Sequence, residues 1–308
     1  MKKRCILQLI FIIAVTIFFQ ASAFSLEGVH PSDLTYKPIN LSPQVPEKIV
    51  LKNGMVIYTL EDHELPLFTI QAVLKTGAIY EPTEKTGLAS MTGSLMRSGG
   101  TESMSWEEID EKLEFIAGSV ETSIGSDSGS ASLSVMTKDI DEGLKIFADV
   151  LMHPVFDQGK IDITKNQAIE AIRRENDNPA HVARREFRRL LYRDHPYGRK
   201  ATIESVSSIT REDMIAFHKK YYHPNNIMFG ISGDFKKDEI LDKIRSVFRD
   251  WQIKEIDFPE VPRVKKDLER SVNYVYKDVK QSVIRLGHMG LDYRNPDHYA
   301  VILMNYIL

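Results

Sequence analysis

The order in which strand-like and helix-like patterns follow one another most constrains the fold of this chain. Over residues 48–192, three strand patterns come first, followed by two amphipathic helices, two further strands and three further helices. Elements that come in blocks, instead of alternating one for one, are typical of an α+β fold in which helices cover one face of a largely antiparallel sheet. We therefore predict two-layer α+β domains, with a second and incomplete repeat towards the C-terminus.

Local signals define several of these elements. Asn53-Gly54 separates two strand patterns and predicts a tight hairpin. Residues 86–97 carry an apolar stripe at helical spacing and are followed by Gly99-Gly100, which predicts the end of a helix. Ser105 and Glu108 have the spacing of a capping box, which predicts the start of the next helix.

The first residues have the layout of an export signal. A basic cluster at residues 2–4 precedes an apolar run over 6–19, and Ala21-Ser22-Ala23 follows as a cleavage pattern. A membrane span needs about 20 apolar residues, so we predict a signal peptide over 1–23 and no permanent membrane anchor. The single cysteine, Cys5, lies inside that segment. A mature chain without cysteine suits a periplasmic or secreted protein that is stabilised by core packing alone.

The composition and the absence of several motifs exclude certain functions. The formal charge is -3, from 40 Lys+Arg and 43 Asp+Glu. The chain has no excess of basic residues, so its composition does not indicate nucleic-acid binding. No two of the nine histidines are four residues apart, and the sequence holds no G-x-S-x-G, Walker or G-x-G-x-x-G motif. Two helices are locally basic, at Arg173-Arg174 and over residues 184–189. Such a basic face can simply be exposed to solvent. The alternative is a surface that contacts an acidic partner or lines a peptide chamber.

Composition also divides the chain into segments. After the signal peptide we predict an extended leader over 24–47, a first domain over 48–252, a charged linker over 253–269 and the start of a second domain over 270–308. Residues 272–276 and 282–286 are predicted strands, and 296–308 is a predicted apolar helix. That helix has no polar end, so we expect the second domain to be truncated here; the alternative is a short helix that docks on the first domain.

Four segments, in order, resemble the pitrilysin/insulinase family of zinc metallopeptidases. Residues 51–58 resemble the opening hairpin of the family, 86–101 its zinc-motif helix, and 169–179 and 195–199 two later landmarks. The resemblance implies repeated α+β domains, two per half, that close around a peptide chamber. Active members carry H-x-x-E-H on a helix: the two histidines bind zinc, the glutamate activates a zinc-bound water, and a distal glutamate completes the ligands.

At the matching positions this chain has Ser90, Gly93 and Ser94. A serine hydroxyl is a poor zinc ligand beside imidazole, and glycine has no side chain that can accept a proton. The distal position falls on Glu170, which is either a vestigial ligand position or a solvated residue paired with Arg174 at i,i+4. The resemblance therefore implies a zinc metallopeptidase relative without catalytic residues, metal or other cofactor in this chain, whose status as an enzyme is uncertain.

Three functions follow from this resemblance. The first is a non-catalytic subunit of a periplasmic two-chain zinc peptidase, which helps to enclose and bind peptide or unfolded-protein substrates while a zinc-competent insulinase-like subunit cleaves them. The second is an active zinc metalloendopeptidase whose ligands lie elsewhere. The third is a stand-alone peptide-binding or chaperone-like protein that binds extended peptides by strand addition to a sheet edge.

Overall fold

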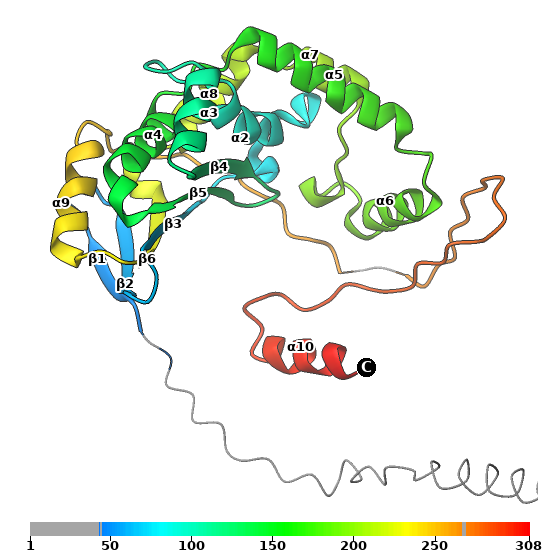
Figure 1. The fold of residues 1–308 in the computed structure, drawn as a ribbon. Coiled ribbons are helices and arrows are strands. Elements are labelled where there is room, and N and C mark those ends of the chain that lie inside the picture. The colour runs from blue at the N-terminus through cyan, green and yellow to red at the C-terminus, as the bar shows by residue number, and fades with distance from the viewer. Residues whose placement is uncertain (1–42, 44, 267–268) are drawn as a thin grey trace, which may run out of the picture. The chain divides into compact units, whose positions relative to one another are not determined.

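The computed structural model describes residues 43, 45–266 and 269–308, so the predicted signal peptide and nearly all of the predicted leader lie outside the described residues. The unit that spans Val45–Leu308 is described below. It contains a six-stranded sheet with the order β1-β2-β6-β3-β5-β4 (Figure 1). The strands are β1 (Glu47–Val50), β2 (Val56–Glu61), β3 (Leu67–Leu74), β4 (Ser119–Ile124), β5 (Gly129–Met136) and β6 (Ile227–Gly233).

The sheet is mixed, and most of its neighbouring strands are antiparallel. Among the described strands, β2 and β6 form the one parallel pair, and the other four pairs are antiparallel. Strand β6 lies between β2 and β3, although more than 150 residues separate it from either strand along the chain. The predicted α+β class, with a largely antiparallel sheet, is confirmed.

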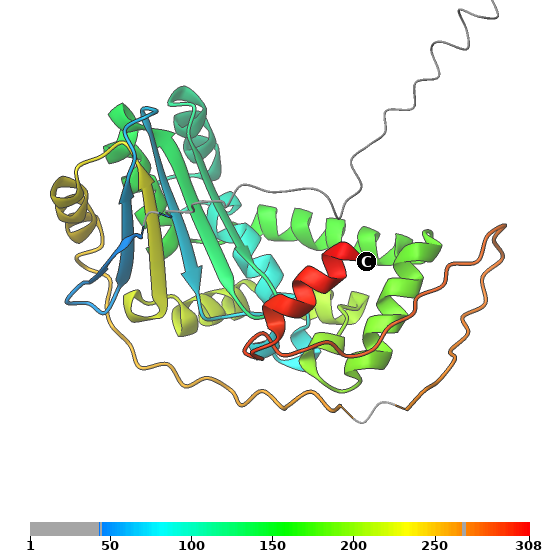
Figure 2. The ribbon, with the colours of Figure 1, turned by 90° about the horizontal axis from the view of Figure 1, so that it is seen from below.

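Helices cover one face of the sheet, which Figure 2 shows from a second direction. Because successive side chains of a strand point to opposite faces, Phe68, Ile70 and Ala72 of β3 are buried beneath the helices, while Gln71 is exposed on the other face. The helices of this unit are α2 (Leu88–Ser98), α3 (Trp106–Phe115), α4 (Ile140–Met152), α5 (Gln158–Arg174), α6 (Pro179–Tyr192), α7 (Ile203–Ser208), α8 (Arg211–Tyr221), α9 (Lys237–Val247) and α10 (His298–Ile307).

The local signals act as the sequence predicts. Gly54 adopts a positive φ of 80° in the β1–β2 turn, a conformation that favours glycine. Gly99 follows the last residue of α2, and Gly100 turns the chain with a φ of 76°. The hydroxyl of Ser105 accepts a hydrogen bond from the Glu108 amide, and the Glu108 carboxylate accepts one from the Ser105 amide. Each of these signals lies within a few residues of the structure that it specifies.

The strands predicted at 272–276 and 282–286 are not formed. Both segments are described without regular structure, and most of their side chains are exposed. A strand is stable only when a neighbour satisfies its backbone groups, and no described segment pairs with either of them. The predicted helix does form, as α10 over His298–Ile307, with its apolar side chains exposed. No described helix combines the length and the apolar character that crossing a membrane requires.

Candidate functional site

The three positions that match the zinc motif lie on α2, in two different environments. Ser90 and Ser94 are exposed and one helical turn apart, whereas Gly93 is buried. The hydroxyl of Ser94 donates a hydrogen bond to the carbonyl oxygen of Met91 (3.1 Å), so it is satisfied within its own helix. The exposed side of α2 therefore presents two small neutral hydroxyl groups.

Gly93 lies where α2 packs against the edge strand β4. A Cβ atom added at this position would lie 2.7 Å from the carbonyl carbon of Ser123, and still closer to the amide nitrogen of Ile124. Real Cβ atoms do not approach backbone atoms so closely, and protein interiors are too densely packed to absorb the overlap without a shift. A glutamate at position 93 consequently does not fit this packing of helix and strand.

Glu170 lies on α5 and is half exposed, with 49% of its side chain accessible. Its Oε1 atom accepts a hydrogen bond from Nη1 of Arg173 at 2.5 Å. The predicted pairing with Arg174 is therefore wrong in detail: the ion pair has i,i+3 spacing, which brings side chains together on a helix as well as i,i+4 does. This contact supports the interpretation of Glu170 as a solvated, paired surface residue.

These side chains do not fit a catalytic zinc ion. Within 43, 45–266 and 269–308, no three His, Cys, Asp or Glu side chains are close enough together to hold a metal. Two neutral hydroxyls, a glycine and a carboxylate that is already paired with an arginine lack the imidazole donors that an open zinc site uses.

A buried carboxylate that the sequence patterns do not reveal fixes the start of α2. The carboxylate of Glu81 accepts hydrogen bonds from the amides of Gly87 (3.0 Å) and Ala89 (2.9 Å), and the residue is only 5% exposed. Burial raises the pKa of Glu81, while the two amides and nearby Arg199 act in the opposite direction. Gly87 is the N-cap residue and has no side chain, so Glu81 supplies the acceptor that free helix amides need.

The turn at 195–199 joins this region to α6. The Nδ1 atom of His195 accepts a hydrogen bond from the amide of Tyr197 (3.1 Å), which confirms the predicted turn, and burial lowers the pKa of His195. The Tyr197 hydroxyl donates to Oδ2 of Asp127 (3.3 Å), in the turn between β4 and β5. Arg199 donates through Nη1 to the carbonyl oxygen of Glu81 (3.0 Å). The turn therefore contacts both the approach to α2 and the β4–β5 hairpin.

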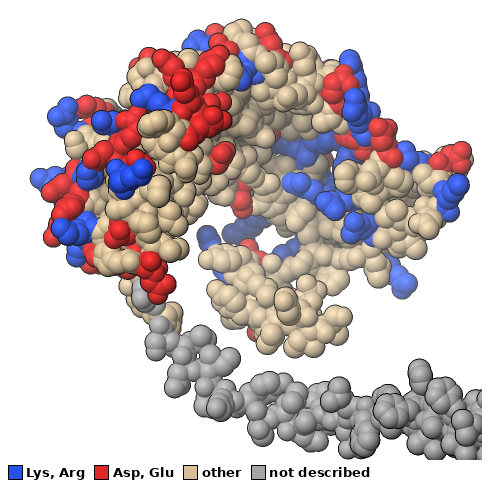
Figure 3. Space-filling view, in the orientation of Figure 1, with Lys and Arg blue, Asp and Glu red and all other residues tan. Residues whose placement is uncertain are grey.

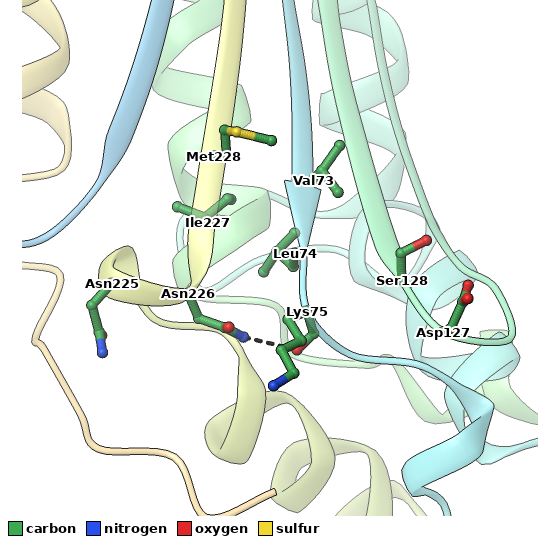
Figure 4. Close-up of a pocket in the computed structure, with 9 residues that line it drawn as sticks. All are labelled: Val73, Leu74, Lys75, Asp127, Ser128, Asn225, Asn226, Ile227 and Met228. Atoms are coloured by element: carbon green, nitrogen blue, oxygen red, sulfur yellow. Dashed lines mark hydrogen bonds between the residues drawn. The ribbon is translucent and has the colours of Figure 1, made fainter. Parts of the chain in front are cut away.

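A hollow of about 410 Å³ opens at one end of the sheet, beside the same hairpin (Figure 4). The side chains of Val73 and Met228 form an apolar part of its wall, with Lys75 and Asp127 at its polar end. Asn226 closes one side and donates through Nδ2 to the carbonyl oxygen of Lys75 (3.0 Å). The hollow offers an ammonium, a carboxylate and an amide, so it can bind a polar group.

The fold of this chain is similar to those of several proteins with solved structures. It superposes on the peptidase M16 inactive domain from Pseudomonas fluorescens with a TM-score of 0.65 at 22% identity, over 71% of this chain and 54% of that one. The first half of the periplasmic protease PqqL from Escherichia coli gives a TM-score of 0.64 at 19% identity, over 73% and 50% of the two chains. At these identities the likeness defines an M16-like α+β domain fold.

Sequence comparison defines the family. Residues 56–203 match the model of the insulinase family (peptidase family M16), and residues 208–308 match the peptidase M16 inactive domain. The chain is a homologue of the M16 insulinase/pitrilysin family of peptidases.

Individual relatives include both a protease and a non-peptidase. An uncharacterised zinc protease of Rickettsia felis is 24% identical, over 80% of this chain and 59% of its own length. The non-peptidase homologue YmxG of Helicobacter pylori is 23% identical, over 84% of this chain and 57% of its own length. The chain thus spans less than two thirds of the length of these relatives.

Proposed function

We propose that this chain is the non-catalytic, zinc-motif-deficient subunit of a periplasmic two-chain zinc peptidase. A zinc-competent insulinase-like subunit performs the hydrolysis, and this chain helps to enclose and bind peptide or unfolded-protein substrates. The packing of Gly93 against β4, between exposed Ser90 and Ser94, is the observation that carries the proposal. The helix keeps its buried cap and its contact with the sheet, but it presents no zinc ligand and no general base.

The names of two relatives support a non-catalytic, multi-chain role. The Helicobacter pylori homologue is named for not being a peptidase. A Dictyostelium discoideum relative, 20% identical over 91% of this chain and 56% of its own length, is the beta subunit of mitochondrial-processing peptidase. The export signal expected over residues 1–23 supports the periplasmic part of the proposal.

The free edge of β4 supports peptide binding. Among the described strands β4 pairs only with β5, so the backbone groups on its other side have no strand partner. An extended peptide can satisfy such groups by adding a strand to the sheet. A stand-alone peptide-binding protein would use the same edge, and what distinguishes it from a subunit is whether the protein elutes alone or with a zinc-bearing relative.

The test is to purify the full-length protein, alone and mixed with its zinc-competent homologue from the same organism. Bound zinc is measured by mass spectrometry, and cleavage is measured with internally quenched peptides. We expect a stable complex, zinc in the homologue alone, and cleavage that rises several-fold when the two chains are mixed.

The matched control replaces the glutamate of H-x-x-E-H by glutamine in the homologue, which should abolish cleavage in the mixture. Stoichiometric zinc and cleavage by this chain alone would overturn the proposal in favour of an active zinc metalloendopeptidase. Elution without any zinc-bearing partner, together with tight peptide binding, would favour the stand-alone function.

A further inference from the structure

Residues 170–200, which include α6, are strongly basic in an otherwise acidic chain. They hold nine Lys and Arg against five Asp and Glu, although the formal charge of the whole chain is -3. In Figure 3, basic side chains gather over the region where Figure 1 places α6. A positive surface on an acidic protein attracts anionic groups and repels cationic ones.

The exposed side of α6 carries two arginines that lack carboxylate partners. His181, Arg184 and Arg188 follow one another at i, i+3 and i+7 and are all exposed; we call these three residues the α6 basic face. Within the described part of the chain Arg184 has no ion pair, and Arg188 donates only through Nε, to the carbonyl oxygen of Tyr197 (2.5 Å). By contrast, Arg189 is paired with Glu186 (2.8 Å).

Hydrogen bonds tie this face to the candidate site. Tyr197, whose carbonyl oxygen holds the Arg188 side chain, also donates its hydroxyl to Asp127 at the β4–β5 turn. Two residues later, Arg199 donates to the carbonyl oxygen of Glu81, which caps α2. Arg188 of the α6 basic face is therefore held by the same turn that contacts the hairpin containing the free edge of β4.

The spacing of the two arginines matches an extended acidic peptide. Four residues of an α-helix rise by about 6 Å, so Arg184 and Arg188 are that far apart along the helix axis. Alternate residues of an extended peptide lie on one side of it and are about 6.6 Å apart. A guanidinium group can donate two parallel hydrogen bonds to one carboxylate, which favours arginine over lysine for this recognition.

We propose that the α6 basic face binds an acidic, extended stretch of the peptide substrate, with carboxylates at alternate positions. The inference rests on the proposed function in one respect, namely that the bound molecule is an extended peptide. It adds the chemical class of the substrate, and it assigns Arg184 and Arg188 as the residues that select it.

The test measures binding of two fluorescein-labelled ten-residue peptides to the full-length protein by fluorescence anisotropy. One peptide carries Glu at alternate positions, and the other carries Gln at those positions. We expect the Glu peptide to bind about tenfold more tightly at low salt, and the difference to shrink at high salt because exposed charges are screened. The double variant Arg184→Glu/Arg188→Glu should abolish this preference and leave the affinity for the Gln peptide unchanged.

The matched control is Lys48→Glu/Lys145→Glu, which makes the same change in charge at exposed lysines of β1 and α4. It should retain the preference for the Glu peptide. Equal binding of the two peptides by the unmodified protein, or equal loss of preference in both double variants, would overturn the inference. So would Arg184- and Arg188-dependent binding of phosphatidylglycerol vesicles without any preference between the peptides.

Failure of this inference can be distinguished from failure of the proposed function. Cleavage by the mixture with the zinc-competent homologue depends on assembly, and it can be measured with the Gln peptide. If the mixture cleaves the Gln peptide but the protein shows no preference for the Glu peptide, only the inference about α6 is excluded. The opposite result is also informative. If the preference for the Glu peptide requires Arg184 and Arg188 but the chain never assembles with the homologue, only the proposed subunit role is excluded.

Discussion

Even the smallest substitution of Gly93, its replacement by alanine, should disturb the packing of the candidate site. In Gly93→Ala the added methyl group must push α2 and β4 apart, because it would lie 2.7 Å from the carbonyl carbon of Ser123. Overpacking of this kind costs about 1–3 kcal/mol, which is more than the roughly 1 kcal/mol that alanine gains over glycine within a helix. Urea unfolding followed by circular dichroism should show a lower midpoint for the variant.

The matched control for this substitution is Ser94→Ala on the same helix. Ser94 is exposed, so the change should alter the free energy of unfolding by less than about 0.5 kcal/mol. A Gly93→Ala protein as stable as the unmodified protein would contradict the packing described for α2 and β4.

His218 should make the protein sensitive to acid. Burial lowers the pKa of His218 to about 4, its Nε2 atom donates to the carbonyl oxygen of Leu151 (2.9 Å), and its ring stacks on Tyr222. The unfolded chain binds a proton near pH 6.5, before the folded chain does. Stability from this residue is therefore complete above pH 6.5 and falls as the pH drops from 6.5 to about 4, by up to about 3 kcal/mol.

The measurement is the free energy of unfolding at several pH values between 7 and 4. The variant His218→Gln keeps a donor for Leu151 and does not titrate, so its unfolding free energy should fall less steeply over this range. An identical pH dependence in the two proteins would show that His218 does not contribute to acid sensitivity.

At the scale of elements, the start of α2 depends on Glu81. In Glu81→Ala the amides of Gly87 and Ala89 lose their acceptor, and each unsatisfied buried donor costs about 1–3 kcal/mol. Hydrogen exchange at these two amides should become faster, and the free energy of unfolding should fall. Glu81→Gln retains one side-chain acceptor and should lie between the two. Unchanged exchange in Glu81→Ala would mean that the first turn of α2 is held by other contacts.

The elements that the sequence predicts well are those whose signals are local. The capping box at Ser105 and Glu108 and the glycines after α2 specify their own conformation within a few residues. The helix α7 over Ile203–Ser208 escapes prediction because it is short and its capping box uses Ser205 in place of an acidic residue. The cap on α2 is not predicted for another reason. Glu81 accepts a hydrogen bond from the Ala89 amide although it lies outside the helix, and no sequence-spacing rule describes the turn between them.

At the scale of the whole molecule, the predicted linker over 253–269 should be the first place that a protease cuts. The structure describes 253–266 without regular structure, but Phe258 still packs on Tyr221, with ring centroids 5.8 Å apart. Exposed Arg263 and Lys265 lie beyond that contact. Because cleavage requires local opening, brief trypsin treatment should cut at Arg263 or Lys265 before any site within 45–252.

Mass spectrometry identifies the first fragments, and circular dichroism shows whether the N-terminal fragment keeps its helices. We expect that fragment to remain folded, because the described sheet and the helices packed on it all precede residue 252. Early cuts inside 45–252 would contradict the domain boundaries predicted from the sequence.

The sequence by itself determined the α+β class, most helices and strands, and the residue types at the motif-like positions, since periodicity, caps and side-chain chemistry are properties of neighbouring residues. It also indicated that Ser90, Gly93 and Ser94 lack the donors that a zinc site requires. Only the tertiary structure placed β6 between β2 and β3, set Gly93 against β4, and brought Glu81 and Arg199 together at the start of α2. Those contacts join residues far apart along the chain, and packing in three dimensions selects them, so no local pattern contains them.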